Sequence, residues 1–108
     1  MVGDSKLSDS ITWTDRQLQR KHSKHAADFG VSRNYTPQSA KKFKQALKDF
    51  VDQPYTVKIQ GIYRSQPVTL YTDLGYSKVV LVSPSGEFVS GWKLNADQGN
   101  NLKQRHSL

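Results

Sequence analysis

The sequence predicts an α+β fold in which two N-terminal helices pack on a small antiparallel β-sheet. Residues 14–53 carry apolar side chains at helical spacing between capping signals. Residues 55–94 instead carry short alternating stretches separated by turn residues. The links between these stretches are too short for crossover helices, so neighbouring strands are expected to run antiparallel.

The first helix is expected to begin after Thr14 and to end at Gly30. Thr14 and Gln17 form a T-x-x-Q capping pattern, which satisfies two free backbone donors at a helix start. Gly30 suits the left-handed conformation in which many helices end. The side chains expected on one shared face are Leu18, His22, His25, Ala26 and Phe29.

The second helix is expected between Thr36 and Pro54. Thr36 is a good N-cap, and Pro37 fits the first helical position, where its missing N–H costs nothing. Pro54 ends the helix. The residues expected on the buried stripe are Ala40, Phe43, Ala46, Leu47, Phe50 and Val51.

Strands are expected over 55–59, 62–64, 68–71, 78–82 and 87–94, with a break or bulge at Gly61. The run Ser83-Pro84-Ser85-Gly86 predicts a tight turn before the last strand. In that strand, alternation places Phe88, Ser90, Trp92 and Leu94 on the face toward the helices.

The domain organisation expected from these patterns is a single domain over residues 14–97. Residues 1–13 are expected to be a flexible leader, and residues 98–108 an irregular polar tail. A chain of 108 residues has room for one compact domain. No apolar run approaches the roughly 18–20 residues of a membrane span. The absence of cysteine excludes disulfides, thiol catalysis and thiolate zinc sites.

Positive charge is concentrated in one part of the sequence. The chain has 16 Lys and Arg against 9 Asp and Glu, a formal net charge of +7. Within residues 14–48 the only acidic side chains are Asp15 and Asp28, so this segment carries the excess. Its basic side chains are Arg16, Arg20, Lys21, Lys24, Arg33, Lys41, Lys42, Lys44 and Lys48. Such a local field points to a polyanion as partner: RNA, DNA or an acidic protein.

The run Arg20-Lys21-His22-Ser23-Lys24-His25 combines the groups that metal-independent RNA cleavage requires. This reaction needs proton transfer near the ribose 2′-OH and fixed positive charge around the phosphate. Histidine exchanges protons near neutral pH, and lysine or arginine supplies the charge. Lys21 and His25 are four residues apart and lie side by side on a helix. The same histidines also fit ordinary packing on the helix face.

A metal site and a phosphate pocket are two further interpretations of polar residues in the sequence. His22, His25 and Asp28 are spaced three and three, but this spacing swings their side chains apart around the helix, and two lysines would repel a divalent ion. We therefore predict no metal and no other cofactor. Ser90, in contrast, is polar on an apolar face and needs a partner. Opposite His25, it could donate to a phosphate oxygen, with Trp92 as core residue or pocket floor.

Three blocks of sequence carry a family signal. They are Lys24-His25-Ala26-Ala27-Asp28-Phe29-Gly30, Gly61-Ile62-Tyr63-Arg64 and Gly86-Glu87-Phe88-Val89-Ser90-Gly91-Trp92-Lys93-Leu94-Asn95. Together, over about residues 14–97, they resemble the catalytic domain of the colicin D family, including C-terminal toxin domains of contact-dependent inhibition systems. The resemblance implies a fold of the barnase-like ribonuclease group and a bacterial toxin (a bacteriocin-type endonuclease) that cleaves the tRNA anticodon loop without a metal. The implied products carry a 2′,3′-cyclic phosphate and a 5′-hydroxyl.

The resemblance also implies roles for individual residues. The catalytic histidine, its adjacent lysine, the serine and the tryptophan of the family fall on His25, Lys24, Ser90 and Trp92. A further family lysine falls on His22, so His22, Lys21 or neither supplies that second charge. The residues expected to bind RNA are Arg20, Lys21, His22, Lys41, Lys42, Lys44 and Lys48.

The partner and place of action are likewise expectations from the family. They are a small acidic immunity protein that covers the site, and delivery from the producer cell into the cytoplasm of a target bacterium. Two other functions remain open from the residues themselves. One is a non-catalytic basic RNA-binding module, and the other is an interaction domain for an acidic protein.

Overall fold

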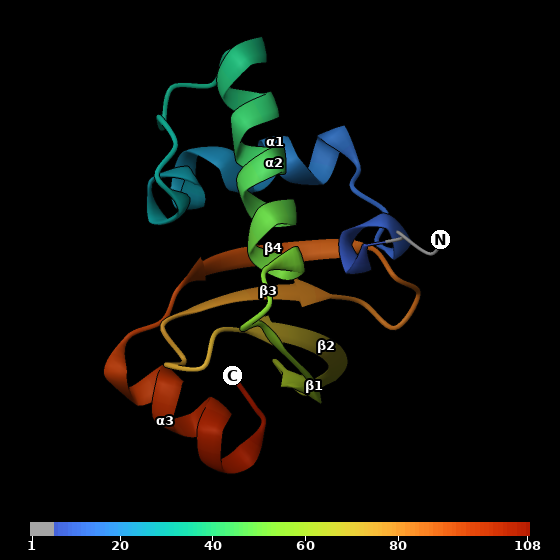
Figure 1. Ribbon diagram of the computed structural model, residues 1–108, viewed down its shortest axis with the longest axis vertical. Helices are drawn as coiled ribbons and strands as arrows, with labels where there is room; N and C mark the ends of the chain where they lie inside the picture. The colour runs from blue at the N-terminus through green and yellow to red at the C-terminus, as the bar shows by residue number, and fades with distance from the viewer. Residues whose placement is uncertain (1–5) are drawn as a thin grey trace.

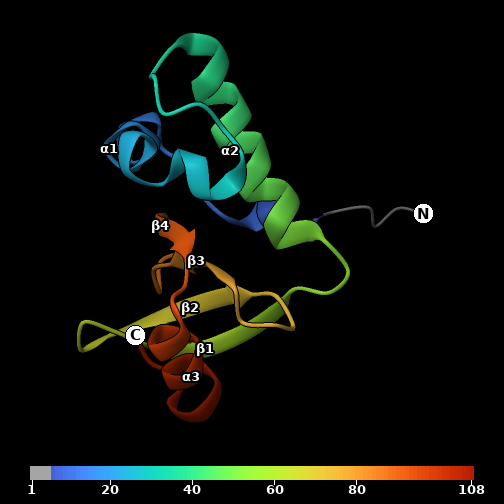
Figure 2. The ribbon, with the colours of Figure 1, turned by 90° about the vertical axis from the view of Figure 1, so that its left-hand side faces the viewer.

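The computed structural model describes residues 6–108, which form three layers. Helices α1 (Asp15–His25) and α2 (Pro37–Asp52) lie on one side of a four-stranded sheet, and α3 (Ala96–Arg105) lies on the other side (Figures 1 and 2). Short 3-10 turns, η1 (Leu7–Ser10) and η2 (Ala26–Phe29), flank α1. The predicted α+β class is confirmed, and none of the helices within 6–108 is long and apolar enough to cross a membrane.

The sheet is an antiparallel meander in the order β1-β2-β3-β4. Its strands are β1 (Val57–Tyr63), β2 (Gln66–Thr72), β3 (Lys78–Val82) and β4 (Phe88–Lys93). The predicted turn before β4 is present, with Gly86 N–H donating to the Ser83 carbonyl at 2.9 Å. Strand β4 is thus an edge strand, and Figure 1 shows α1 and α2 beyond this edge.

The helix caps lie at the residues that the sequence predicts, but the Gln17 side chain donates to the Val89 carbonyl and does not complete the predicted box with Thr14. The Thr14 side chain accepts from Gln17 N, and Thr36 and Ser39 form a reciprocal capping box ahead of Pro37. Gly30 ends η2 in the left-handed conformation, with φ of 75°. The first helix, however, changes to 3-10 geometry at Ala26 instead of continuing to Phe29 as one α-helix.

The hydrophobic core has two parts, one on each face of the sheet. The helix-side part includes Ile11, Leu18, Phe43, Leu47, Val51, Val80 and Phe88. The part under α3 includes Ile59, Val68, Leu70, Val79, Leu81 and Leu102. Both faces of this four-stranded sheet are therefore covered by apolar side chains. Each Å² of apolar area removed from water contributes roughly 25 cal/mol to the free energy of folding.

The predicted polar tail is wrong, because residues 96–105 form α3. Asn95 caps this helix in a reciprocal box with Gln98, and Leu102 is fully buried. One buried leucine among polar residues gives too weak a periodicity to reveal a helix. The chain then continues along β1, where Ile62 and Ser107 form a parallel bridge.

Residues 6–13, which were predicted as part of a flexible leader, contact the rest of the domain; residues 1–5 of that leader lie outside the described residues. Ser8 donates from its backbone N to the Asp52 carboxylate at 2.9 Å, and Thr12 bridges to Glu87 beside β4. These polar contacts are far apart in sequence, so no local pattern predicts them. The ordered part of the domain therefore exceeds the expected range of 14–97.

The predicted break at Gly61 is absent, because β1 pairs with β2 continuously through this residue. Gly61 is needed for another reason: the His106 carbonyl occupies the place where a Cβ would stand. The irregularity lies instead in β4. Leu81 pairs with Ser90 and Val82 with Phe88, so Val89 is an extra residue in the ladder.

Candidate active site

The bulge at Val89 changes which side chains of β4 face the helices. Phe88 packs in the helix-side core, whereas Trp92 packs with the core under α3. Gly91 faces the helices, since a Cβ there would lie 3.1 Å from the Leu47 side chain. The predicted common face of Phe88, Ser90, Trp92 and Leu94 is therefore wrong, because the alternation restarts after the bulge.

Helix α1 is nevertheless held against the edge strand β4. The Gln17 side-chain amide donates to the carbonyl of Val89, the bulged residue, at 2.5 Å. This contact fixes the first turn of α1 against β4, and the last turn lies beside Trp92. The His25 and Trp92 ring centroids are 6.0 Å apart.

A basic cavity of about 380 Å³ opens at this place. Its lining residues come from α1, β1, β4, α3 and the C-terminal segment: Lys21, Lys24, His25, Tyr63, Arg64, Ser90, Trp92, Gln98 and Leu108. The structure thus brings together five of the residues predicted from the sequence, namely His25, Lys24, Ser90, Trp92 and Lys21.

Several residues of the basic cavity were not assigned a role from the sequence. Tyr63 lies 5.6 Å from the Trp92 ring, and the Arg64 guanidinium lies 5.1 Å over Tyr63. Gln98 accepts from the Trp92 indole N–H at 3.4 Å and from Asn95 N at 3.0 Å. The N-x-x-Q capping pattern at Asn95 was the available signal for α3 and Gln98.

His22 does not belong to the basic cavity. It is 1% exposed, and its ring packs edge-on at 5.3 Å from both Tyr35 and Phe43. Neither ring nitrogen has a hydrogen-bond partner within the described chain. The expectation that His22 binds RNA is therefore wrong, because the side chain is enclosed between α1 and α2.

Helical geometry explains why His22 and His25 differ. The stripe of α1 and η2 that points into the core repeats every four residues, as Leu18, His22 and Ala26. His25 and Lys21 lie beside this stripe, at the margin that looks toward β4. Lys21 therefore lines the basic cavity together with His25, one helical turn away from it.

The environment of His25 favours its neutral form. Partial burial lowers the pKa of the imidazole below its ordinary 6.5, and the nearby Lys21 and Lys24 lower it further. Asp28 opposes this by raising the pKa, since its carboxylate lies 3.7 Å from His25 Nδ1. The Lys93 backbone N–H donates to the same carboxylate oxygen at 3.1 Å.

This arrangement gives the two imidazole nitrogens different roles. The Asp28 carboxylate lies 3.7 Å from Nδ1 and favours the tautomer with its proton on that nitrogen, which leaves Nε2 to accept a proton. A neutral imidazole so oriented can act as a general base. Asp28 figured in the sequence only as a poor metal ligand, and among residues 6–108 no three His, Asp or Glu side chains gather as a metal site would require.

The lysines around His25 create a positive field that the single Asp28 carboxylate offsets only in part. Burial lowers the pKa of Lys21, and the charges of Arg20, Lys24 and Arg64 lower it further. Like charges packed this closely repel one another, so an anion that enters the basic cavity removes an unfavourable interaction. The arrangement suits a phosphate group in contact with several cations at once.

The remaining predicted RNA-binding residues lie outside the basic cavity. Arg20 is exposed on α1, close enough to affect Lys21. The four lysines of α2 are more distant, and two of them, Lys41 and Lys44, border a separate hollow of about 220 Å³ between the helices. The positive charge of residues 14–48 is therefore dense around His25 and more dispersed along α2.

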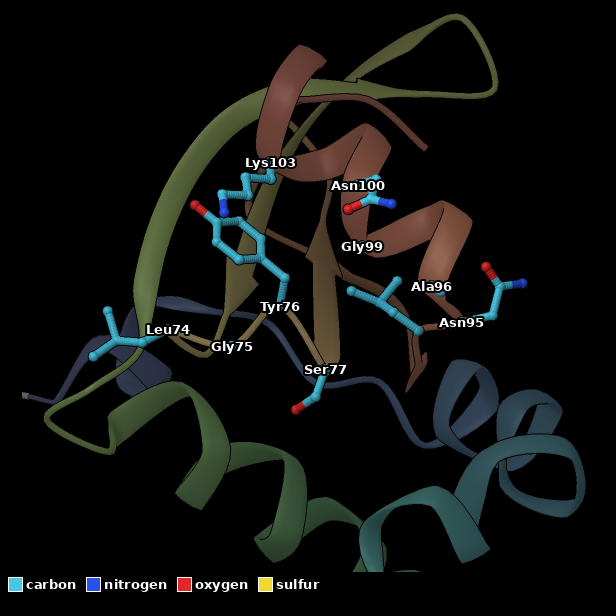
Figure 3. Close-up of a pocket in the computed structure, with 10 residues that line it drawn as sticks. Leu74, Gly75, Tyr76, Ser77, Asn95, Ala96, Gly99, Asn100 and Lys103 are labelled. Carbon is cyan, nitrogen blue, oxygen red and sulfur yellow. The ribbon is translucent and has the colours of Figure 1, made fainter.

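A second large hollow, of about 440 Å³, lies between the β2–β3 turn and α3 (Figure 3). Tyr76 projects into this hollow toward α3 (Figure 3). Gly99 of α3 lies so close to the Tyr76 backbone that a Cβ atom on residue 99 would stand 3.0 Å from the Tyr76 carbonyl oxygen. Lys103 is the only cationic residue among those that line it. The nearby Asp73 carboxylate is held by the Ser77 backbone N–H and hydroxyl, and no histidine is among the lining residues, so this hollow lacks the imidazole and lysine grouping of the basic cavity.

Comparison with known proteins places the chain in a family. A family model described as Colicin D matches residues 17–102, which include all of the cavity residues except Leu108. The chain is 35% identical over 94 residues to Colicin-D of Escherichia coli, covering 85% of this chain and 13% of the length of that protein. It is also similar to a solved ribonuclease from Escherichia coli complexed with its inhibitor protein, with a TM-score of 0.76 and 34% identity over 85% of this chain and 100% of that chain. The chain therefore belongs to the colicin D family.

Proposed function

We propose that the chain is the ribonuclease domain of a bacterial toxin, and that it cleaves tRNA in the anticodon loop without a metal ion. The observation that carries this proposal is that His25, Lys21, Lys24 and Ser90 line one cavity together with Trp92. Membership of the colicin D family and the likeness to a solved ribonuclease support it.

The reaction begins with proton removal from the ribose 2′-OH. The neutral His25 takes this proton at Nε2, and the 2′-oxygen then attacks the neighbouring phosphorus. Partial burial keeps the imidazole in its basic form near neutral pH. Asp28 holds the ring orientation and stabilises the imidazolium that forms, because its carboxylate faces Nδ1.

Negative charge then develops on the pentavalent phosphorus. Lys24 and Lys21 lie in the cavity where they can stabilise this charge, and the Ser90 hydroxyl can donate to a non-bridging oxygen. The bond from phosphorus to the 5′-oxygen breaks, and that oxygen must receive a proton. Lys21 suits this step because its lowered pKa makes its ammonium a readier donor than an ordinary lysine. The products are a 2′,3′-cyclic phosphate and a 5′-hydroxyl.

The wider positive surface contributes to RNA binding. Lys41, Lys42, Lys44 and Lys48 contact the RNA backbone beyond the scissile bond in this proposal, and Arg20 acts closer to the cavity. Such contacts release counterions and give affinity that falls steeply with salt. The same positive field attracts an acidic immunity protein that covers the cavity, and the solved ribonuclease complexed with its inhibitor protein supports such a partner. As a colicin D family toxin, the domain acts in the cytoplasm of a target bacterium.

The experiment that tests the function is a cleavage map of total bacterial tRNA incubated with the protein in EDTA. A single cut in one anticodon loop, with a 2′,3′-cyclic phosphate at the new end, is the expected result. Salt-sensitive binding without any product would identify a non-catalytic RNA-binding module instead. A stoichiometric complex with an acidic protein that tRNA fails to displace would indicate an interaction domain.

A further inference from the structure

An apolar groove of about 390 Å³ adjoins the basic cavity. Its residues are Tyr63, Arg64, Gln66, Pro67, Val68, Ser83, Pro84 and Val89, contributed by the β1–β2 hairpin, the β3–β4 turn and the bulge of β4. Tyr63 and Arg64 line both hollows, so the groove and the basic cavity share a wall.

The shared wall has the properties of a stacking platform. The Arg64 guanidinium lies over the Tyr63 ring at 5.1 Å, and Tyr63 in turn lies against Trp92 at 5.6 Å. Planar guanidinium and aromatic faces are the surfaces on which unpaired RNA bases stack. Gln66 and Ser83 add polar side chains at an otherwise apolar groove, where they can reach the edge of a base.

The hairpin that carries Arg64 is built at a conformational cost. Arg64 and Ser65 adopt φ of 51° and 66°, left-handed conformations for which such turns normally use Asn or Gly. Residues in such sparsely populated conformations cluster at functional sites. Here the turn places Arg64 at the boundary between the two hollows.

We infer that the apolar groove binds the nucleobase of a nucleotide next to the scissile phosphate. The inference rests on the proposed function, since the basic cavity receives the phosphate. A nucleotide whose phosphate lies among Lys21, Lys24 and Arg64 has its base within reach of the adjoining groove. Pro67 and Pro84, both exposed, provide flat apolar surfaces on the walls of the groove.

The test uses binding without cleavage. The isotope-labelled chain of 108 residues is titrated with 2′-O-methyl trinucleotides, which lack the attacking hydroxyl, with each of the four bases in turn at the central position. A matched trinucleotide has an abasic central position. NMR should show shifts of the amides of Gln66, Val68 and Val89 with at least one base, and these shifts should be lost with the abasic probe. Shifts at Lys24 and His25 should persist with both, and affinity should fall about 10-fold without the base.

A pair of protein variants separates stacking from a general loss of structure. The double variant P67A/P84A should bind the preferred trinucleotide about 10-fold more weakly and the abasic one equally well. Pro54→Ala, an exposed proline outside the groove, should bind both probes as the wild type does. An equal loss of affinity for both probes in P67A/P84A would overturn the inference.

The outcomes distinguish this inference from the function on which it rests. Shifts at the basic cavity without shifts at the groove would reject the nucleobase site and leave the ribonuclease proposal intact. No shifts at either place with any trinucleotide would reject both.

Discussion

Replacing His22 by phenylalanine is expected to stabilise the protein without reducing RNA cleavage. The His22 ring is enclosed between α1 and α2, and neither of its nitrogens has a partner within residues 6–108. Phenylalanine keeps the edge-on contacts with Tyr35 and Phe43 and removes both unpaired polar atoms. The substitution therefore separates the buried histidine from the cavity histidine by experiment.

The size of the effect follows from the cost of an unsatisfied polar group. Burying a donor or acceptor without a partner costs about 1–3 kcal/mol. Weak contacts between the imidazole and the two aromatic rings offset part of this cost. We expect a net gain of about 1–2 kcal/mol, which corresponds to a rise in Tm of roughly 5–10 °C for a domain of this size.

The assay is chemical denaturation of the wild type, His22→Phe and His22→Gln, with tRNA cleavage measured in parallel. His22→Gln retains unpaired polar atoms in the same place and should bring no gain. A His22→Phe protein that is less stable than the wild type would refute the assignment of His22 to a closed apolar interface. A loss of cleavage with an intact fold would instead refute its exclusion from the site.

Three other predictions concern the basic cavity and its surroundings. The pKa of His25 is lowered, so its imidazole stays neutral at pH values below its ordinary pKa of 6.5. The acidic limb of the kcat/KM profile should therefore lie below pH 6.5, and a limb above that value would contradict the prediction. Asp28→Asn should reduce kcat about 10- to 100-fold. It should also move the acidic limb to still lower pH, because Asp28 raises the pKa of His25. An unchanged kcat together with an unmoved limb would show that Asp28 plays no part. Replacing Lys41, Lys42, Lys44 and Lys48 by alanine should weaken tRNA binding and reduce the salt slope by about 1 per lysine with kcat preserved; a salt slope equal to that of the wild type would remove them from the interface.

The features predicted well from the sequence depend on neighbours in the chain. Thr14, Thr36 and Gly30 act through hydrogen bonds and dihedral angles within a few residues, so their patterns are informative by themselves. The alternating strands and the turn at Gly86 are local in the same sense. The sequence therefore predicts the α+β class, the first two helices and the meander.

The features predicted poorly depend on contacts between distant parts of the chain. The bulge at Val89 arises from pairing with β3, and it reverses the faces of β4 beyond Phe88. The full burial of His22 and the partial burial of His25 depend on how α2 packs, because both lie near one helical face. The family resemblance still identified His25, Ser90 and Trp92 as neighbours, although the predicted strand face was wrong.

Cleavage of purified tRNA in EDTA by His25→Ala, compared with the wild type, tests the central claim most directly. His25 is the one imidazole that lines the basic cavity, so its removal should lower the cleavage rate by about 10³-fold or more. Circular dichroism and the denaturation midpoint should remain close to those of the wild type, because the side chain stands at the cavity margin. Cleavage at near wild-type rate by a folded His25→Ala protein would contradict the proposed chemistry.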